Sequence, residues 1–228
     1  MSEVQFASAS GDCQGYLAVP AGGSGPGVVV IQEWWGLVPH IRDVADRFAA
    51  AGYVALAPDH YRGAITTEPD EAGKLMMGME VDSAAADIAG AADFLISRPE
   101  VSSGSLGAVG FCMGGGLALL APTVHPAIVA TSAFYPAMPW PDYSPDWSRY
   151  ANRAAIIHQA VSDAESSGAR IAEYAGQILA AGGSVTLFDY PESVHAFFND
   201  QRPEVYQAHN AALAWQRTID LFERSLRS

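Results

Sequence analysis

The fold is decided by residues 106–117, LGAVGFCMGGGL, in which one cysteine stands between an apolar run and a second segment of helical character. The run Leu106 to Phe111 is typical of a buried strand, and Leu117 to Ala121 is typical of a helix. A Gly-x-Cys-x-Gly turn between them strains the backbone of the nucleophile, and a Cβ in place of either glycine would collide with a neighbouring element. We therefore expect Cys112 on a sharp turn at a helix N-terminus, where the helix dipole favours a thiolate.

Two other interpretations of this turn are open. Cysteine is among the most buried residue types, so Cys112 and its glycines could serve packing alone. A dinucleotide-binding loop is the other alternative, and a dehydrogenase would follow from it. That loop needs glycine at the position of Cys112 and normally follows the first strand of the sheet, so we disfavour it.

Outward from the turn, short β-branched runs alternate with longer amphipathic stretches, a pattern typical of a mostly parallel sheet with helices on both faces. Two segments near the N-terminus indicate an antiparallel edge hairpin, Val4 to Ala7 and Gln14 to Ala18. Buried strands are expected at Val28 to Gln32, Val54 to Ala57, Leu106 to Phe111, Ile128 to Phe134, Ala155 to Gln159 and Val185 to Phe188. Helices are expected at Ile41 to Ala50, Val81 to Ile96, Leu117 to Ala121, Ser167 to Ala181 and Glu204 to Arg224, with long loops at Tyr61 to Gly73 and Pro136 to Asn152.

Composition narrows the class of protein further. Half of the 228 residues are hydrophobic and 16% are charged, which excludes a disordered or fibrous chain and favours one α/β domain spanning 1–228. The formal net charge of -13 repels phosphate backbones and anionic lipids, so neither nucleic acid nor a membrane is an expected partner. No apolar run approaches the roughly 20 residues that span a bilayer.

The N-terminus and the cysteine content predict a reducing compartment. The first residues, MSEV, lack the basic start and apolar core of a secretory signal, so a cytoplasmic location is expected. The two cysteines, Cys13 and Cys112, cannot form a disulfide framework. The histidines lack metal-ligand spacing, and no metal or organic cofactor is implied.

A thiolate nucleophile needs a base, and the base needs an acid to orient it. His195 lies in a loop after the last expected strand, and Asp163 follows the strand Ala155 to Gln159. The order nucleophile, acid, base along the chain is the order that hydrolases of this architecture use. Asp189 and Asp142 are alternatives for the acid.

The stretch QEWWG, residues 32–36, follows the first central strand and brings an acid and two tryptophans to its carboxyl end. Ligands of α/β sheets bind at that edge, so Glu33 is a candidate for the site, although an exposed acid beside core aromatics is an equal alternative. The backbone N–H groups of Trp34 and Met113 are well placed to form an oxyanion hole, because one follows the first central strand and the other follows the nucleophile.

Aromatic residues are expected to wall an apolar pocket near the same edge, although ordinary packing in the core or loops is an open alternative. The residues expected to contact substrate are Trp34, Trp35, Tyr135, Phe197 and Asn199, with Trp140 and Trp147 as further candidates for the wall.

Together these motifs resemble the dienelactone hydrolase family over nearly the whole chain. The resemblance is carried by Gln32-Glu33-x-x-Gly, Pro58-Asp59-x-Tyr61, Gly110-x-Cys112-x-Gly114-Gly115 and His195-x-Phe197. It implies an α/β-hydrolase fold without a separate cap domain, with Cys112 as nucleophile, His195 as base and Asp163 as orienting acid. It also implies that Glu33 contacts the resting cysteine.

The sequence departs from this family where lactone-cleaving members carry arginines that bind the substrate carboxylate. The stretch after His195 has Asn199 and no cation until Arg202, and the segment from Gly63 to Ser97 contains only Lys74. A buried carboxylate without a cation is costly, so we expect neutral substrates to be favoured over anionic ones.

The sequence therefore predicts a hydrolase that cleaves a small ester or lactone through an acyl-enzyme intermediate on Cys112. The alternative is a non-hydrolytic binding or redox-sensing protein on the same fold. The only partner that the sequence predicts is the small-molecule substrate, and the expected oligomeric state is a monomer or weak homodimer.

Overall fold

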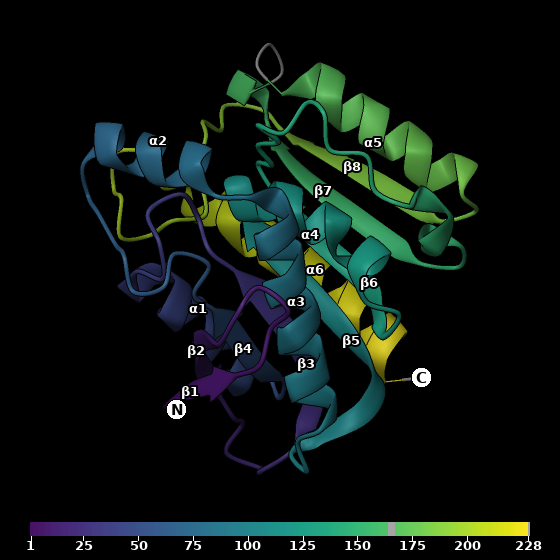
Figure 1. Ribbon diagram of the computed structural model, residues 1–228. Coiled ribbons are helices and arrows are strands. Elements are labelled where there is room, and N and C mark those ends of the chain that lie inside the picture. The colour runs from purple at the N-terminus through teal and green to yellow at the C-terminus, as the bar shows by residue number, and fades with distance from the viewer. Residues whose placement is uncertain (164–166, 228) are drawn as a thin grey trace.

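The computed structural model describes residues 1–163 and 167–227 and folds them into an eight-stranded sheet with helices on both faces (Figure 1). The strands are β1 (Ser2–Phe6), β2 (Cys13–Ala18), β3 (Gly25–Ile31), β4 (Val54–Pro58), β5 (Val101–Phe111), β6 (Ile128–Phe134), β7 (Ala154–Ala160) and β8 (Ser184–Tyr190). The α-helices are α1 (Pro39–Ala50), α2 (Pro69–Gly78), α3 (Val81–Ile96), α4 (Met113–Val124), α5 (Gly168–Ala180) and α6 (Ala208–Leu226). Short 3-10 helices lie at η1 (Trp147–Tyr150) and η2 (Val161–Asp163).

The strands are ordered β1-β2-β4-β3-β5-β6-β7-β8 across the sheet. The N-terminal hairpin is antiparallel and pairs antiparallel with β4, whereas every pairing from β4 to β8 is parallel. This confirms the α/β class, the mostly parallel sheet and the edge hairpin. The carboxyl ends of the parallel strands consequently meet at one edge, where ligands of such sheets bind.

The middle strands β3 and β5 contain apolar runs because both of their faces are covered there. Every residue of β3 is buried, and in β5 the buried part runs from Leu106 to Phe111. Continuous β-branched runs of this kind suit parallel strands between two helical layers.

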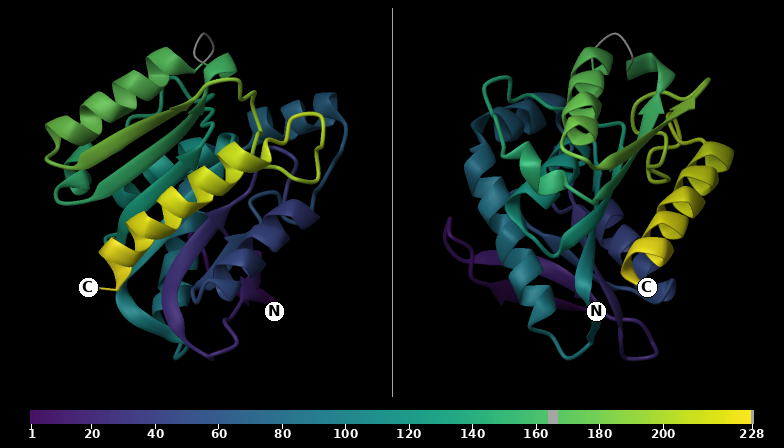
Figure 2. Two further views of the ribbon diagram at one scale, coloured as in Figure 1. Left: turned by 180° about the vertical axis from the view of Figure 1, so that it is seen from behind. Right: turned by 90° about the vertical axis from the view of Figure 1, so that its right-hand side faces the viewer.

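Two helical layers enclose the sheet, as the right-hand view of Figure 2 shows for α6 on one side and α3 on the other. On one face α1 and α6 meet through Phe48, whose ring centroid lies 4.6 Å from that of Trp215 and 5.9 Å from that of Phe222. On the other face α3 packs beside α4, and α4 covers β5 and β6. This layering fixes the strand ends that carry the site.

Several boundaries differ from the expectations; among the strands, β5 begins at Val101 rather than Leu106, and three helices show the larger differences. Helix α2 forms where a loop from Tyr61 to Gly73 was expected; it begins at a proline, and only Ala72 is buried, so it lacks the apolar stripe that identifies a helix. Helix α4 begins at Met113 rather than Leu117, because its glycines pack closely against neighbouring strands and their loops. Helix α6 begins at Ala208 rather than Glu204.

Within residues 1–163 and 167–227, no helix combines the length and apolar character that crossing a bilayer requires.

Candidate active site

The side chains expected to carry chemistry come from loops at the carboxyl ends of four parallel strands. Glu33 follows β3, Cys112 follows β5, Asp163 follows β7 and His195 follows β8. The topology therefore brings these four residues, far apart in sequence, to one edge of the sheet.

The turn at Cys112 has the strained geometry expected of a nucleophile between a strand and a helix. Its backbone is left-handed, with φ 55° and ψ -120°, which is costly for a residue with a Cβ. A Cβ at Gly110 would lie 1.9 Å from the carbonyl oxygen of Gly114, and one at Gly114 would lie 2.3 Å from that of Gln32. Both glycines are thus required for the turn to close against the neighbouring backbone.

Hydrogen bonds hold this turn from both sides. The Cys112 N–H donates to the carbonyl of Phe134 at 3.0 Å, and the Cys112 carbonyl accepts from the N–H groups of Gly115 and Ala137, each at 2.9 Å. Cys112 is 8% exposed, so the residue is largely buried yet still reached by solvent. Nearby backbone strain recurs at Tyr135, φ 37°, and Ala196, φ 69°, and such strain concentrates at functional sites.

His195 and Asp163 are brought together. The imidazole Nδ1 lies 2.8 Å from Asp163 Oδ2, and the backbone N–H of His195 donates to the hydroxyl of Ser162 at 3.2 Å. Because Nδ1 is occupied by the carboxylate, Nε2 is the nitrogen that can serve Cys112. The alternative acids Asp189 and Asp142 are both exposed and make no contact with His195 in the described part of the chain.

The electrostatics of His195 favour its protonated form. Burial alone lowers its pKa, but hydrogen bonds with Asp163 and Cys112 and the negative charges of both raise the pKa to about 10. A negatively charged sulfur at Cys112 therefore favours the protonated imidazole beside it. Its side chain is still 40% exposed, so a substrate can approach it.

Glu33 is buried beside this pair and has different partners from those implied by the family resemblance. Its Oε1 accepts from the Tyr135 hydroxyl at 3.3 Å, and its Oε2 accepts from Asn199 Nδ2 at 3.2 Å. Burial raises the Glu33 pKa, and the charge of His195 and these two hydrogen bonds oppose that rise. The amide of Asn199 thus holds one oxygen of Glu33 and the Tyr135 hydroxyl holds the other, and the contact with Cys112 that the family resemblance implies stays a prediction.

The two backbone N–H groups expected to form an oxyanion hole belong to Trp34 and Met113, and both can donate to a substrate. Met113 is the first residue of α4, where N–H groups have no intrahelical partner. The N–H of Trp34 donates to no protein oxygen within residues 1–163 and 167–227. Both groups lie beside the nucleophile turn, since Gly114 packs directly against the β3 end that leads to Trp34.

A cavity of about 870 Å³ reaches Asn199, the hydrogen-bond partner of Glu33, but Cys112, His195 and Asp163 do not line it. Trp35 and Asn199, two of the residues expected to contact substrate, line it. Its other lining residues are Val38, Pro39, His40, Ile65, Thr66, Thr67, Pro69, Gln201, Arg202 and Glu204. Most of these residues could not be identified from the sequence, because they lie at the start of α1, on the segment leading into α2 and in the loop before α6, and these segments have no distinctive motif.

The other aromatic residues expected around substrate do not line this cavity, namely Trp34, Tyr135, Phe197, Trp140 and Trp147. Tyr135 and Phe197 are fully buried, and the Phe197 ring lies 4.9 Å from that of Tyr190, so Phe197 supports the site from within the core. Trp147 packs against Tyr174 of α5 at 4.9 Å. The Trp34 ring meets that of Trp35 at 4.8 Å and is partly exposed.

Comparison with known proteins agrees with this geometry. The model of the dienelactone hydrolase family matches residues 13–226. The chain belongs to the dienelactone hydrolase family. It is therefore an enzyme, a hydrolase, and the α/β-hydrolase fold implied by the sequence resemblance is confirmed.

Curated relatives match along almost their full length. The chain is 33% identical to "Protein usf" of Aquifex pyrophilus, with 98% of each chain covered. It is 34% identical to a Synechocystis protein named "Putative carboxymethylenebutenolidase", with 93% of this chain and 92% of that protein covered. A dienelactone hydrolase-like promiscuous phosphotriesterase from metagenomic libraries shares the fold, with a TM-score of 0.86 at 23% identity over 99% of this chain and 98% of that one.

Proposed function

We propose that the protein cleaves a small neutral ester or lactone through a Cys112–His195–Asp163 triad and an acyl-enzyme on Cys112. The observation that carries the proposal is the pairing of His195 Nδ1 with Asp163 at 2.8 Å, together with the interaction of the same imidazole with Cys112. A base held by an acid on one nitrogen and serving a nucleophile with the other is the arrangement that activates a thiol.

In the first half of the reaction the Cys112 sulfur attacks the carbonyl carbon and forms the S–C bond. The carbonyl electron pair moves to oxygen, where the N–H groups of Trp34 and Met113 stabilise the developing charge. Collapse of this intermediate breaks the bond to the alkoxy oxygen, which takes the proton from His195. For a lactone the released hydroxyl stays attached to the acyl group.

The second half releases the acid. The acylated sulfur of Cys112 carries no charge, so two of the interactions that raise the His195 pKa are lost and the imidazole can be neutral. Neutral His195 then takes a proton from water, whose oxygen attacks the thioester carbonyl. The S–C bond breaks and the thiolate–imidazolium pair re-forms.

Trapping the intermediate tests this proposal. We expect a p-nitrophenyl ester, mixed with the protein and quenched in acid, to leave one acyl group that peptide mass spectrometry locates on Cys112. Saturating turnover of several such esters with no acyl group on Cys112 would contradict the acyl-enzyme. A sulfur that gains only oxygen atoms under mild peroxide, in a protein that hydrolyses no ester or lactone, would instead support a redox-sensing protein.

The cavity predicts the charge of the preferred substrate. Asn199 stands where a carboxylate-binding cation is expected in lactone-cleaving members, and the guanidinium of Arg202, which also lines the cavity, is paired with Glu204 at 2.9 Å. We expect kcat/KM for a neutral lactone to exceed that for a carboxylate-bearing dienelactone by about tenfold or more, about 1.4 kcal/mol.

The matched control for this prediction is Arg202→Gln, measured at moderate salt with both lactones. Because Arg202 is already paired, the ratio of the two kcat/KM values should change little. A wild-type preference for the anionic lactone that disappears in Arg202→Gln would show that Arg202 binds the carboxylate.

A further inference from the structure

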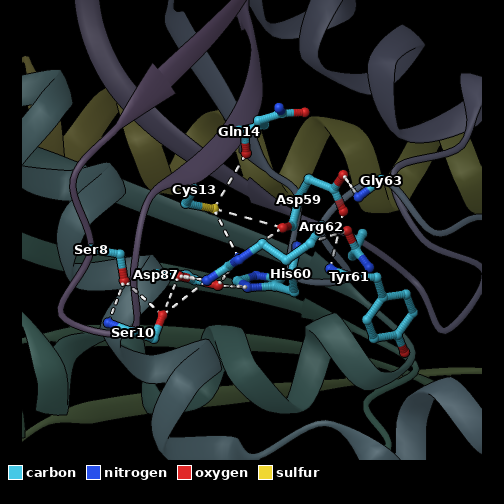
Figure 3. Close-up of polar contacts among 11 residues, drawn as sticks. Ser8, Ser10, Cys13, Gln14, Asp59, His60, Tyr61, Arg62, Gly63 and Asp87 are labelled. Carbon is cyan, nitrogen blue, oxygen red and sulfur yellow. Dashed lines mark hydrogen bonds and ion pairs between the residues drawn. The ribbon is translucent and has the colours of Figure 1, made fainter.

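The motif Pro58-Asp59-x-Tyr61, which starts at the last residue of β4, has no part in the triad, yet its turn is tightly held (Figure 3). Asp59 is 5% exposed, and its carboxylate accepts from the N–H of Tyr61 at 3.0 Å and from that of Gly63 at 2.6 Å. The side chain of Asp59 thus closes the turn and fixes the backbone of Tyr61.

An ion pair with α3 holds the next residue. Arg62 has a left-handed backbone, φ 54°, and its guanidinium donates two hydrogen bonds to Asp87, at 2.7 and 2.8 Å. Asp87 is 1% exposed and also accepts from the Ser10 hydroxyl at 2.8 Å, while His60 Nδ1 lies 3.4 Å from it. Figure 3 shows these groups converging on Asp87 of α3 from two other segments of the chain, one with Ser10 and one with His60 and Arg62.

Asp87 stays negatively charged in this ion pair, because its pKa is lowered. Burial acts to raise the Asp87 pKa, but hydrogen bonds from His60, Arg62 and Ser10 hold it below its usual range. Bidentate pairs between arginine and carboxylate also fix geometry. The left-handed conformation of Arg62 is therefore maintained, and with it the direction of the preceding Tyr61.

Tyr61 reaches the nucleophile turn. Its hydroxyl donates to the thioether sulfur of Met113 at 3.3 Å, and Met113 is fully buried directly after Cys112. Burial and then the negative charge of Cys112 raise the Tyr61 pKa, so the hydroxyl remains a donor throughout the neutral range. Methionine is flexible at three bonds, and this contact holds the end of its side chain.

We propose that Tyr61 is a positioning residue of the active site, which aligns the Met113 N–H with the oxyanion and is itself held by the Arg62–Asp87 ion pair. The inference rests on the proposed function, because it acts on the oxyanion hole assigned there. The oxyanion carries its charge in the transition state and not in the bound substrate, so a displaced N–H donor weakens transition-state stabilisation more than it weakens substrate binding. The effect of losing Tyr61 should consequently fall on kcat rather than on KM.

The first test is Tyr61→Phe, which removes the hydroxyl and keeps the ring. We expect kcat for a p-nitrophenyl ester to fall by about tenfold, with KM changed by less than about twofold. Alkylation of Cys112 by iodoacetamide should keep its wild-type rate, because that reaction forms no oxyanion. Tyr16→Phe is the matched control, since the Tyr16 hydroxyl bonds Asp46 of α1, and it should leave kcat unchanged.

The second test asks whether Tyr61 acts through Met113. Met113→Leu removes the sulfur acceptor with little change in volume. If the two side chains act as one unit, Tyr61→Phe should have no further effect in the Met113→Leu background. Additive losses in the double variant, or equal losses in kcat and alkylation rate in Tyr61→Phe, would overturn the positioning role.

A third variant addresses the ion pair. Arg62→Lys keeps the charge but cannot form the two-pronged contact with Asp87, and we expect kcat to fall while KM holds, as in Tyr61→Phe. An unchanged kcat would remove the ion pair from the proposal. Failure of the proposed function itself has a different signature, because wild-type protein would then hydrolyse no ester or lactone at all.

Discussion

Cys112→Ala is expected to remain folded and to lose ester hydrolysis by about 10⁴-fold or more in kcat/KM. The physical reason is that no other group at the site can form the bond to the acyl carbon. Only the oxyanion donors and the binding cavity would be left. Alanine fits the turn sterically, because the strain at φ 55° exists already with cysteine and only the sulfur is removed.

The control for this prediction is the second cysteine. Cys13→Ala also removes a buried thiol. Burial raises the pKa of Cys13 to about 12, so this thiol stays protonated. Cys13 contacts the carbonyl of Asp59 and the guanidinium of Arg62, so its removal should cost some stability while most of the activity remains. Turnover retained in Cys112→Ala, with wild-type circular dichroism and melting temperature, would refute the central role of Cys112.

Cys112→Ala should also change the pKa of the neighbouring His195 imidazole. Removing the sulfur removes two of the interactions that raise the His195 pKa to about 10, while burial and Asp163 stay in place. The His195 pKa should therefore fall in Cys112→Ala. Nuclear magnetic resonance titration of the imidazole checks this, and an unchanged pKa would show that the sulfur does not interact with the ring.

The sheet could be predicted from sequence because its signal is local. Strand β3 and the part of β5 from Leu106 to Phe111 are apolar runs, and the glycines around Cys112 fit a sharp turn between this strand and the helix that follows it. Helix α2 could not be predicted in this way. It buries only Ala72, so its sequence has no apolar stripe to identify.

The positions of Cys112, Asp163 and His195 could be predicted for a topological reason. Each follows a parallel strand, and parallel strands end at one edge, so chain order alone brings the three residues together. Contacts between side chains are a different matter. The hydrogen bond from Asn199 to Glu33 joins residues 166 positions apart, and no periodicity in the sequence encodes it.

The buried position of Phe197 and the lining of the cavity could not be predicted for the same reason, because both depend on contacts between residues far apart in the sequence. Position 197 lies next to the catalytic loop, which favours contact with substrate, but its ring is taken into the core between Tyr135 and Tyr190. The cavity instead takes its wall from Ile65 and Pro69, whose nearness to Trp35 follows from the path of the chain after β4.

The second large effect is expected at the base and its acid. His195→Gln should lower kcat/KM by about 10³-fold or more, because glutamine can neither protonate the leaving oxygen nor take a proton from water. Asp163→Asn should also lower it strongly, since the amide replaces a charge-assisted partner at Nδ1 and lets the His195 pKa fall. Members of a triad act as a unit, so the double variant should lose little more than His195→Gln alone.

Two exposed residues of the same types provide the controls. His209 lies on the exposed surface of α6, and Asp189, one of the two alternatives for the acid, is exposed on β8. His209→Gln and Asp189→Asn should both retain wild-type kcat/KM on the same p-nitrophenyl ester. If Asp189→Asn abolished activity and Asp163→Asn did not, the orienting acid would be Asp189, and the 2.8 Å contact at His195 would have only a structural role. The parallel order of β7 and β8 argues against that outcome, because Asp189 precedes the end of its own strand, whereas Asp163 lies beyond the end of β7, at the edge where Cys112 emerges.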